Sequence, residues 1–597
     1  MHYHPPLKDI SFVLFELFNA AQTLNRYPEF EEIDQDLMSQ VIEEAGRFAS
    51  EILLPTNAVG DREGCQFENG HVKTPSGFKQ AYRQFQEAGW PALACDPAYG
   101  GQGLPHTLNT VLYEMLTGTN HAWSMFPGLL HGAYSSLYHY ANDELKDIYL
   151  PKIVSGEWLA TMCLTEPQAG SDLGLIRTKA TPADNGHYIL EGNKIFISGG
   201  EHDLTENIVH LVLARLPDAP PGSKGISLFL VPKFLPENGV PKVRNAVHCT
   251  GIEHKMGIHG SATCSIQFEQ ATGWLVGEPN KGLAAMFKMM NAARLLVGIN
   301  GVGVSETVYQ NALAYAKERI QMRAATRPEN RHSEPADPIV MHPAIQRMLM
   351  SQKAYAEGGR MLAYYSALLL DGAEHHPDEQ IKAHFESELA LLTPIIKAML
   401  TDQGFEAAGQ AIQIFGGHGY IQETGIEQYL RDIKIAQIYE GTNEIQAIDL
   451  IMRKILADNG QRLFNLLDQI QETINTTTQP AFVNSVAALT QVCQHLRALI
   501  PAISDASRQS PDLPYQIAPE MLRLVGHAAM GWLWLKAATI ADEQKEKDPA
   551  FYGSKIDTAQ YYFDFILPET RQLIQVIDQY LIHSQQGHST NYLDSLM

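Results

Sequence analysis

Apolar residues recur at helical spacing along most of the chain, and one central stretch breaks this pattern. Asp34–Leu54 and Phe78–Ala88 show the three- and four-residue spacing of amphipathic helices, and helical patterns resume from Leu108 to about Ser155. Pro55 is expected to end the first of these helices. From about 160 to 277, short runs rich in Val, Ile, Thr and Phe alternate with turn clusters, which predicts antiparallel strands in a sheet or barrel.

Helical periodicity returns after the strand-rich stretch. It covers Gly282 to about Met322 and then, beyond a polar segment with several prolines, 343–372 and 378–415. Asp458–Gly460 marks a boundary, and helical patterns continue to the end of the chain. Because helices and strands are segregated rather than alternating, we predict an α+β multidomain protein. The predicted domains are a helical N-terminal domain (1–160), a middle antiparallel β domain (161–280), a helical domain (281–457) and an extra C-terminal helical domain (458–597).

Composition narrows the class of protein. The 597 residues include 44 Lys and Arg against 67 Asp and Glu, so the formal net charge is −23, which argues against nonspecific nucleic-acid binding. A hydrophobic content of 45% excludes wholesale disorder. The six cysteines include no pair at C-x-x-C spacing, which fits a reducing compartment. Without a basic N-terminal region or an apolar run of about 20 residues, we expect a cytoplasmic protein that has no signal peptide or integral membrane segment.

Two segments near the predicted strands carry residues suited to binding. CLTEPQAGSDLG (163–174) is a turn whose backbone N–H groups and hydroxyls could hold a phosphate or the polar edge of a cofactor. A capped loop between a helix and a strand is the plainer interpretation. In GNKIFISGG (192–200), Phe196 and Ser198 lie two residues apart and share a face, which suits a planar cofactor. A core phenylalanine with a serine at the rim is the alternative.

Two further segments lie in the helical part of the chain. QIFGGHGYIQETG (413–425) has three glycines within four residues, which either permits close approach of a ligand or forms a helix C-cap and a turn. RDIKIAQIYEGTNEIQ (431–446) places Glu440 between two apolar stretches. A desolvated carboxylate there would have its pKa raised toward neutrality, as a general base requires. A solvated glutamate at a helix start is the alternative.

Taken together and in this order, the four segments resemble the signatures of the acyl-CoA dehydrogenases over about residues 35–455. The chain departs from the usual pattern at Leu175, where a small residue is common, and at Gln428, where a basic one is. The resemblance implies that 281–457 forms a four-helix bundle, that FAD lies between it and the β domain, and that a neighbouring subunit completes the FAD site.

The same resemblance implies a reaction. An acyl-CoA thioester is dehydrogenated to the trans-2-enoyl-CoA, with a base taking the α-proton and hydride passing from Cβ to flavin N5. Electrons then leave to an electron-transfer flavoprotein. The cofactor carries the redox chemistry, while the protein supplies the base and the alignment.

Residue roles follow from the resemblance alone. Glu440 matches the catalytic base, and its backbone N–H matches a donor to the thioester carbonyl. Some members place the base at the position of Ala293, which has no proton acceptor here. The implied FAD-binding residues are Thr165, Ser171, Phe196, Ser198, Arg319, Gln413, Gly417, Thr442 and Glu444. The implied substrate-binding residues are Ser171, Asn291, Arg294 and Gly441.

Several alternatives stay open at this level. The length matches the larger bacterial members, for which we expect a homodimer and either a fatty acyl-CoA or a methylthio-substituted acyl-CoA as substrate. An acyl-CoA oxidase, an idle flavin-binding scaffold and a nucleic-acid-binding member are the other possibilities, and the acidic charge argues against the last. No metal is expected, because His248, His254 and His259 have no common ligand spacing. The long 320–342 segment leaves the outer FAD and CoA contacts open.

Overall fold

The computed structural model describes residues 1–586 and 596–597, and only the backbone at position 185. The chain divides into two compact units. We call Val41–Leu296 the mixed unit, and Met1–Gln40 together with Val297–Met597 the helical unit. Residues 587–595, at the end of the predicted C-terminal domain, lie outside the described residues. The boundaries of the four predicted domains stay predictions.

The mixed unit begins within a long helical run that the sequence only partly predicted. Helix α3 (Gln35–Arg47) continues as a π-helical turn (Phe48–Leu53) and then as α4 (Leu54–Glu63). The expectation that Pro55 ends the helix is wrong, because the helical run passes through Pro55, which lies just beyond the π-helical turn. The predicted amphipathic stretch is confirmed as α5 (Phe78–Glu87). The helices that follow are α6 (His106–Ser124), α7 (Leu130–Tyr140) and α8 (Asp143–Val154).

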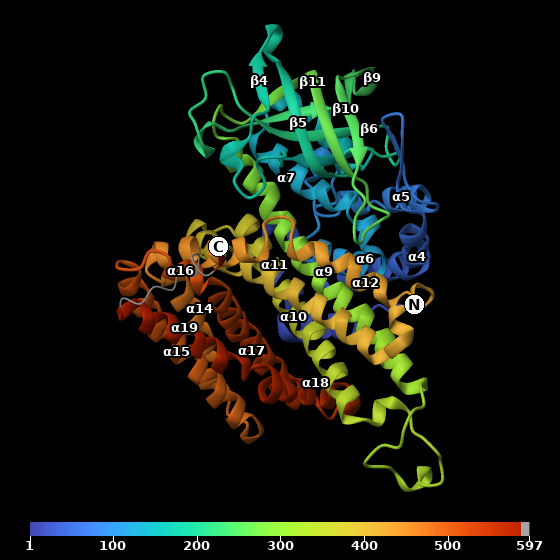
Figure 1. Ribbon diagram of the computed structural model, residues 1–597, viewed down its shortest axis with the longest axis vertical. Helices are drawn as coiled ribbons and strands as arrows, with labels where there is room; N and C mark the ends of the chain where they lie inside the picture. The colour runs from blue at the N-terminus through green and yellow to red at the C-terminus, as the bar shows by residue number, and fades with distance from the viewer. Residues whose placement is uncertain (587–595) are drawn as a thin grey trace. The chain divides into compact units, whose positions relative to one another are not determined.

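A seven-stranded sheet forms the rest of the mixed unit (Figure 1). Its strand order is β3-β6-β7-β11-β5-β4, with β10 paired to β11. All of these pairs are antiparallel except β3–β6, which is parallel and corrects the expectation of a purely antiparallel sheet. The strands are β3 (Trp158–Cys163), β4 (Lys179–Pro182), β5 (Tyr188–Ser198), β6 (Asn207–Ala214), β7 (Ser227–Pro232), β10 (Val247–Ile252) and β11 (Thr263–Val276).

Burial explains why the strand runs differ in sequence. Strands β3, β6 and β7 are buried along their whole length, so they read as continuous apolar runs. Strand β5 mixes buried and exposed positions and has a more polar sequence. Two small hairpins complete the strands: β1 (Gln66–Glu68) with β2 (His71–Lys73), and β8 (Phe234–Glu237) with β9 (Val240–Arg244).

Long helices form the core of the helical unit. The predicted helical stretches are confirmed as α9 (Gly282–Glu318), α10 (Pro343–His375) and α11 (Glu379–Phe415), of which α9 starts in the mixed unit. Helices α9 and α11 pack closely: a Cβ at Gly301 would overlap the Leu400 carbonyl, and Gly404 faces Gly301. The short helices α12 (Ile426–Ile433) and α13 (Asn443–Asp449) follow.

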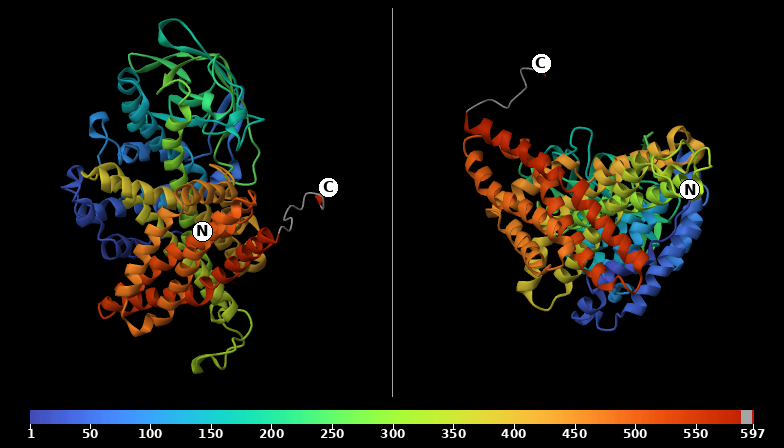
Figure 2. Two further views of the ribbon diagram at one scale, coloured as in Figure 1. Left: turned by 90° about the vertical axis from the view of Figure 1, so that its left-hand side faces the viewer. Right: turned by 90° about the horizontal axis from the view of Figure 1, so that it is seen from below.

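The C-terminal helices begin after a left-handed pair, Asn459 and Gly460. Helix α17 is their buried centre, and its Trp534 is fully buried. Figure 2 shows these helices, coloured orange to red, packed side by side. They are α14 (Gln461–Thr476), α15 (Val483–Ser507), α16 (Leu513–Gln516), α17 (Ala518–Gln544), α18 (Pro549–Tyr561) and α19 (Glu569–Gln585).

The N-terminal segment, with α1 (Leu7–Ser11) and α2 (Ala20–Leu24), belongs to the same unit. A buried ion network ties it to the helices: Asp9 pairs with Arg360 of α10 and with Lys555 of α18. Lys555 Nζ also lies 2.7 Å from Glu357 Oε2. Such a network joins three parts of the chain that are hundreds of residues apart.

One described helix, α9, is long and apolar enough to cross a membrane by length and composition alone. Half of its most apolar window is buried inside the protein. A core helix passes the same test, so this is weak evidence for a membrane span.

Candidate active site

The loop 163–174 is held against strand β5 in the mixed unit. Ile195 N donates to Thr165 O at 2.9 Å, which brings the loop alongside the strand. Lys194 is fully buried and donates to Leu164 O at 2.9 Å and to Glu166 Oε1 at 2.8 Å. The position of Thr165 is therefore set from both sides by β5.

Glu166 is the centre of this arrangement. Its carboxylate also accepts hydrogen bonds from Thr178 Oγ1 at 2.6 Å and from Arg177 N at 2.7 Å. Burial by itself would raise the pKa of the Glu166 carboxyl, but Lys194 and the hydrogen bonds outweigh it and lower that pKa to about 2. Glu166 is thus ionised and acts as an anchor.

The end of β5 exposes an aromatic ring. A β-bulge between Lys194 and Ile197 sets Phe196 at a φ of +59°, and its side chain is 59% exposed while Ile197 is buried. Ser198 is half-buried two residues further on. An aromatic ring left uncovered next to the buried Ile197, with a hydroxyl two residues away, fits the apolar face and polar edge of a flavin.

The remaining predicted residues of the mixed unit are accessible to a ligand. Ser171 is exposed, and Asp172 next to it caps the loop by accepting from Gly174 N at 2.9 Å. On α9, Asn291 is exposed and Arg294 is half-buried, whereas Ala293 is buried and carries no polar atom on its side chain.

In the helical unit, Glu440 stands on a strained turn between α12 and α13. Glu440 has a φ of +57° and Gly441 a φ of +87°, so two successive residues are left-handed. A left-handed residue other than glycine costs about 1–2 kcal/mol, and such outliers concentrate at functional sites. Thr442 caps α13 by accepting from Ile445 N at 3.3 Å, and Gln446 Nε2 donates to Glu440 O at 3.1 Å.

A buried lysine lies beneath this turn. Lys397 of α11 is fully buried, and its Nζ donates to Gly441 O at 2.7 Å and to Asn443 Oδ1 at 2.9 Å. Asn443 Nδ2 in turn donates to Asp402 Oδ1 at 2.7 Å, and burial raises the pKa of Asp402. Sequence reasoning missed Lys397. The signal was a single charge inside the apolar run LLTPIIKAML.

The ends of α9 and α11 contact each other near three further predicted residues. The Tyr315 ring stacks on Phe415 with centroids 4.2 Å apart, and the Tyr315 hydroxyl lies 3.2 Å from His418 Nδ1. The predicted residues nearby in sequence, Arg319, Gln413 and Gly417, are all exposed at this end of the bundle, and so is Glu444 on α13.

The segment 320–342 projects from the bundle as a folded loop (Figure 1). Ile320 and Pro338 form a β-bridge at its base. The fully buried Asp337 accepts from Ala324 N at 2.9 Å, from Arg331 Nε at 2.9 Å and from Arg327 Nη2 at 3.1 Å. These bonds give the loop an internal core of its own.

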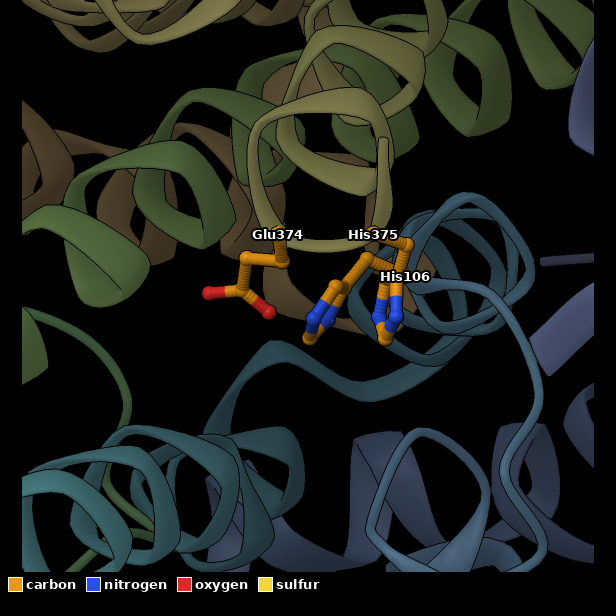
Figure 3. A group of neighbouring side chains, drawn as sticks. All are labelled: His106, Glu374 and His375. Carbon is orange, nitrogen blue, oxygen red and sulfur yellow. The ribbon is translucent and has the colours of Figure 1, made fainter. Parts of the chain in front are cut away.

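No metal site is assigned among the described residues. Figure 3 draws His106 of α6 with Glu374 and His375, which are adjacent in α10. His106 belongs to the mixed unit and the other two to the helical unit. His375 has its own neighbours in the helical unit, since its ring centroid lies 4.6 Å from that of Phe30.

Comparison with known proteins identifies the class. The chain matches the family models of the acyl-CoA dehydrogenase N-terminal domain at 36–157, middle domain at 161–271 and C-terminal domain at 280–456. A fourth model, "acetyl-CoA dehydrogenase C-terminal like", matches 466–580. The chain belongs to the acyl-CoA dehydrogenase family of oxidoreductases, whose cofactor is FAD.

Individual relatives sharpen this placement. The chain is 41% identical to the 3-methylmercaptopropionyl-CoA dehydrogenase of Ruegeria pomeroyi, over 95% of this chain and 97% of the relative. It is 36% identical to the broad-specificity linear acyl-CoA dehydrogenase FadE5 of Mycobacterium tuberculosis, over 97% and 98% respectively. Its fold is similar to that of an acyl-CoA dehydrogenase complexed with FAD from Bacillus anthracis, with 20% identity, a TM-score of 0.72, and 96% and 92% of the two chains covered.

Proposed function

We propose that this protein catalyses the α,β-dehydrogenation of an acyl-CoA thioester, with Glu440 as the base that takes the α-proton. The observation that carries the proposal is the strained, buttressed turn on which Glu440 stands, because a costly backbone conformation persists only where surrounding contacts enforce it. FAD, when bound, would supply the acceptor for the hydride that leaves the β-carbon.

The chain's own residues would supply binding and alignment. We assign Phe196 to the face of the flavin ring, and Thr165 and Ser198 to its polar edge. The other proposed FAD contacts are Ser171, Arg319, Gln413, Gly417, Thr442 and Glu444. Ser171, Asn291, Arg294 and Gly441 would hold the substrate, and the Glu440 N–H would donate to the thioester carbonyl as negative charge develops there.

Partners and substrate follow from the relatives. The 41% identity to a 3-methylmercaptopropionyl-CoA dehydrogenase supports a short acyl-CoA with a thioether as the substrate. We propose an electron-transfer flavoprotein as the electron acceptor, a homodimer as the assembly and the cytoplasm as the location. Anaerobic flavin bleaching against short, long, branched and methylthio acyl-CoAs ranks the substrates, and aerobic peroxide release at the dye-coupled rate would instead favour an oxidase.

The decisive variant is Glu440→Gln. A carboxamide cannot accept the α-proton, so the rate of anaerobic flavin reduction should fall by about 10³-fold while FAD content stays the same. Glu472→Gln, a change to an exposed carboxylate on α14, is the matched control and should leave the rate unchanged. Near wild-type reduction by Glu440→Gln would refute the assignment.

A further inference from the structure

Lys397 combines complete burial with contacts to a turn that carries the proposed base. Its position in the middle of α11 places the ammonium under the Gly441 carbonyl and the Asn443 amide oxygen, at 2.7 and 2.9 Å. Burying a lysine costs free energy unless its ammonium group is hydrogen-bonded. Lys397 makes two of its hydrogen bonds to this one turn, which indicates that the turn depends on it.

We propose that Lys397 is a positioning residue that holds Glu440 in its working geometry. The inference rests on the proposed function of Glu440. Lys397 contacts the residues one and three positions beyond Glu440. It acts through the backbone, by fixing the peptide group that follows Gly441.

The physical argument starts from strain. Glu440 and Gly441 both have positive φ values, and a glutamate relaxes out of that region unless the flanking peptide groups are held. Hydrogen bonds from an ammonium group are roughly twice as strong as neutral ones, so the bond from Lys397 to Gly441 O is suited to this task. The hydrogen bond from Gln446 to Glu440 O holds the peptide group before Gly441, while the bond from Lys397 holds the peptide group after it.

The contacts of Asn443 extend the clamp. Its Oδ1 accepts from Lys397, and its Nδ2 donates to Asp402 Oδ1, which also accepts from Gln437 Nε2 at 2.6 Å. Residues on both sides of Glu440 are therefore tied to α11 through Lys397 and Asp402. The position of the turn relative to α11 is therefore fixed by the hydrogen bonds of these two side chains.

The test compares two buried lysines. Lys397→Met should lower the rate of flavin reduction at saturating acyl-CoA by about 10²-fold, the loss expected from a displacement of about 1 Å, with KM changed by less than about threefold. Lys555→Met removes an equally buried lysine from the ion network with Asp9 and Glu357. It should lower stability while the rate per bound flavin stays at the wild-type value.

Three further measurements test the proposal, and the first stays informative if Lys397→Met folds poorly. Lys397→Arg retains a cationic donor and should recover part of the lost rate, and Asn443→Ala should lower the rate less than additively with Lys397→Met. Hydrogen exchange of the peptide covering 438–446 should be faster in Lys397→Met than in Lys555→Met. An unchanged rate per flavin and unchanged exchange in Lys397→Met would overturn the proposal. If Glu440→Gln reduces flavin normally, the proposed function fails instead.

Discussion

Each of the two units has one candidate segment supported by a fully buried lysine, and the two lysines bind different partners. Lys194 holds the loop 163–174 through an ion pair with Glu166. Lys397 holds the turn at Glu440 through a backbone carbonyl and an amide oxygen. Removing Lys194 leaves the buried Glu166 carboxylate without its charged partner, whereas removing Lys397 takes away two hydrogen bonds that hold a strained turn. We therefore expect replacement of Lys194 to lower mainly the stability of the protein. Replacement of Lys397 should lower mainly the rate of flavin reduction.

Strand β5, which holds the loop, and the turn at Glu440 share one feature, a left-handed residue that is not glycine. In β5 a bulge produces it at Phe196, and in the turn before α13 it occurs at Glu440. These are the residues proposed to face the flavin and to take the proton. The shared strain indicates that both sites hold a side chain in an orientation that an unstrained strand or turn does not provide.

The largest effect on stability should come from Lys194→Met. It leaves Glu166 buried without its ammonium partner, so the free energy of unfolding should fall by about 3–5 kcal/mol. The midpoint of urea unfolding measures this. Lys397→Met should lose clearly less, and an equal loss in the two variants would contradict the distinction between the two lysines.

A smaller effect, with a defined pH dependence, should come from Glu166→Gln. Replacing the ionised acceptor should lower the free energy of unfolding by about 2–3 kcal/mol near neutral pH. Because the pKa of Glu166 is lowered to about 2 from 4.5, its contribution is complete above about pH 4.5 and is lost as the pH falls toward 2. Urea midpoints measured from pH 7 down to pH 3 should therefore converge for the two proteins, and a gap that widens on acidification would refute the ion pair as its source.

The smallest effect concerns the two strained residues. At an ordinary position glycine is less stable than alanine, but at a positive φ the order reverses, because only glycine lacks the Cβ that causes the strain. Phe196→Gly and Glu440→Gly should therefore each be about 1 kcal/mol more stable than the corresponding alanine variants. Thermal unfolding of the four proteins checks this, with Glu472→Gly and Glu472→Ala on α14 as the pair expected to show the usual order.

The segments that carry strong local patterns were predicted well. Helices α9, α10 and α11 and the strand-rich region between 158 and 276 agree with the periodicity of the chain. The Pro55 prediction failed because the helical run continues through the proline next to a π-helical turn, and the sequence pattern does not show that turn. The parallel β3–β6 pair was missed because strand direction depends on the connection between strands rather than on their residues.

The candidate site residues also include some that the sequence identifies and others that only the fold reveals. The motif around Glu440 identifies the residue from sequence, since its neighbours are contiguous in the chain. Lys397 is 43 residues away from it on another helix, and only the packing of α11 under the turn joins them. Glu166 and Lys194 are likewise joined by the loop folding back on β5.

By itself, the sequence determined the order of helices and strands, the family and the identity of the proposed base, because each of these is written in short contiguous patterns. The tertiary structure alone decided which buried charges support those patterns and at which residues the backbone is strained. The physical reason is that desolvation and hydrogen bonding depend on neighbours brought together from distant parts of the chain. In the sequence, a lysine within an apolar run indicates only a costly buried charge. In the folded protein, Lys397 hydrogen-bonds to the turn that carries Glu440.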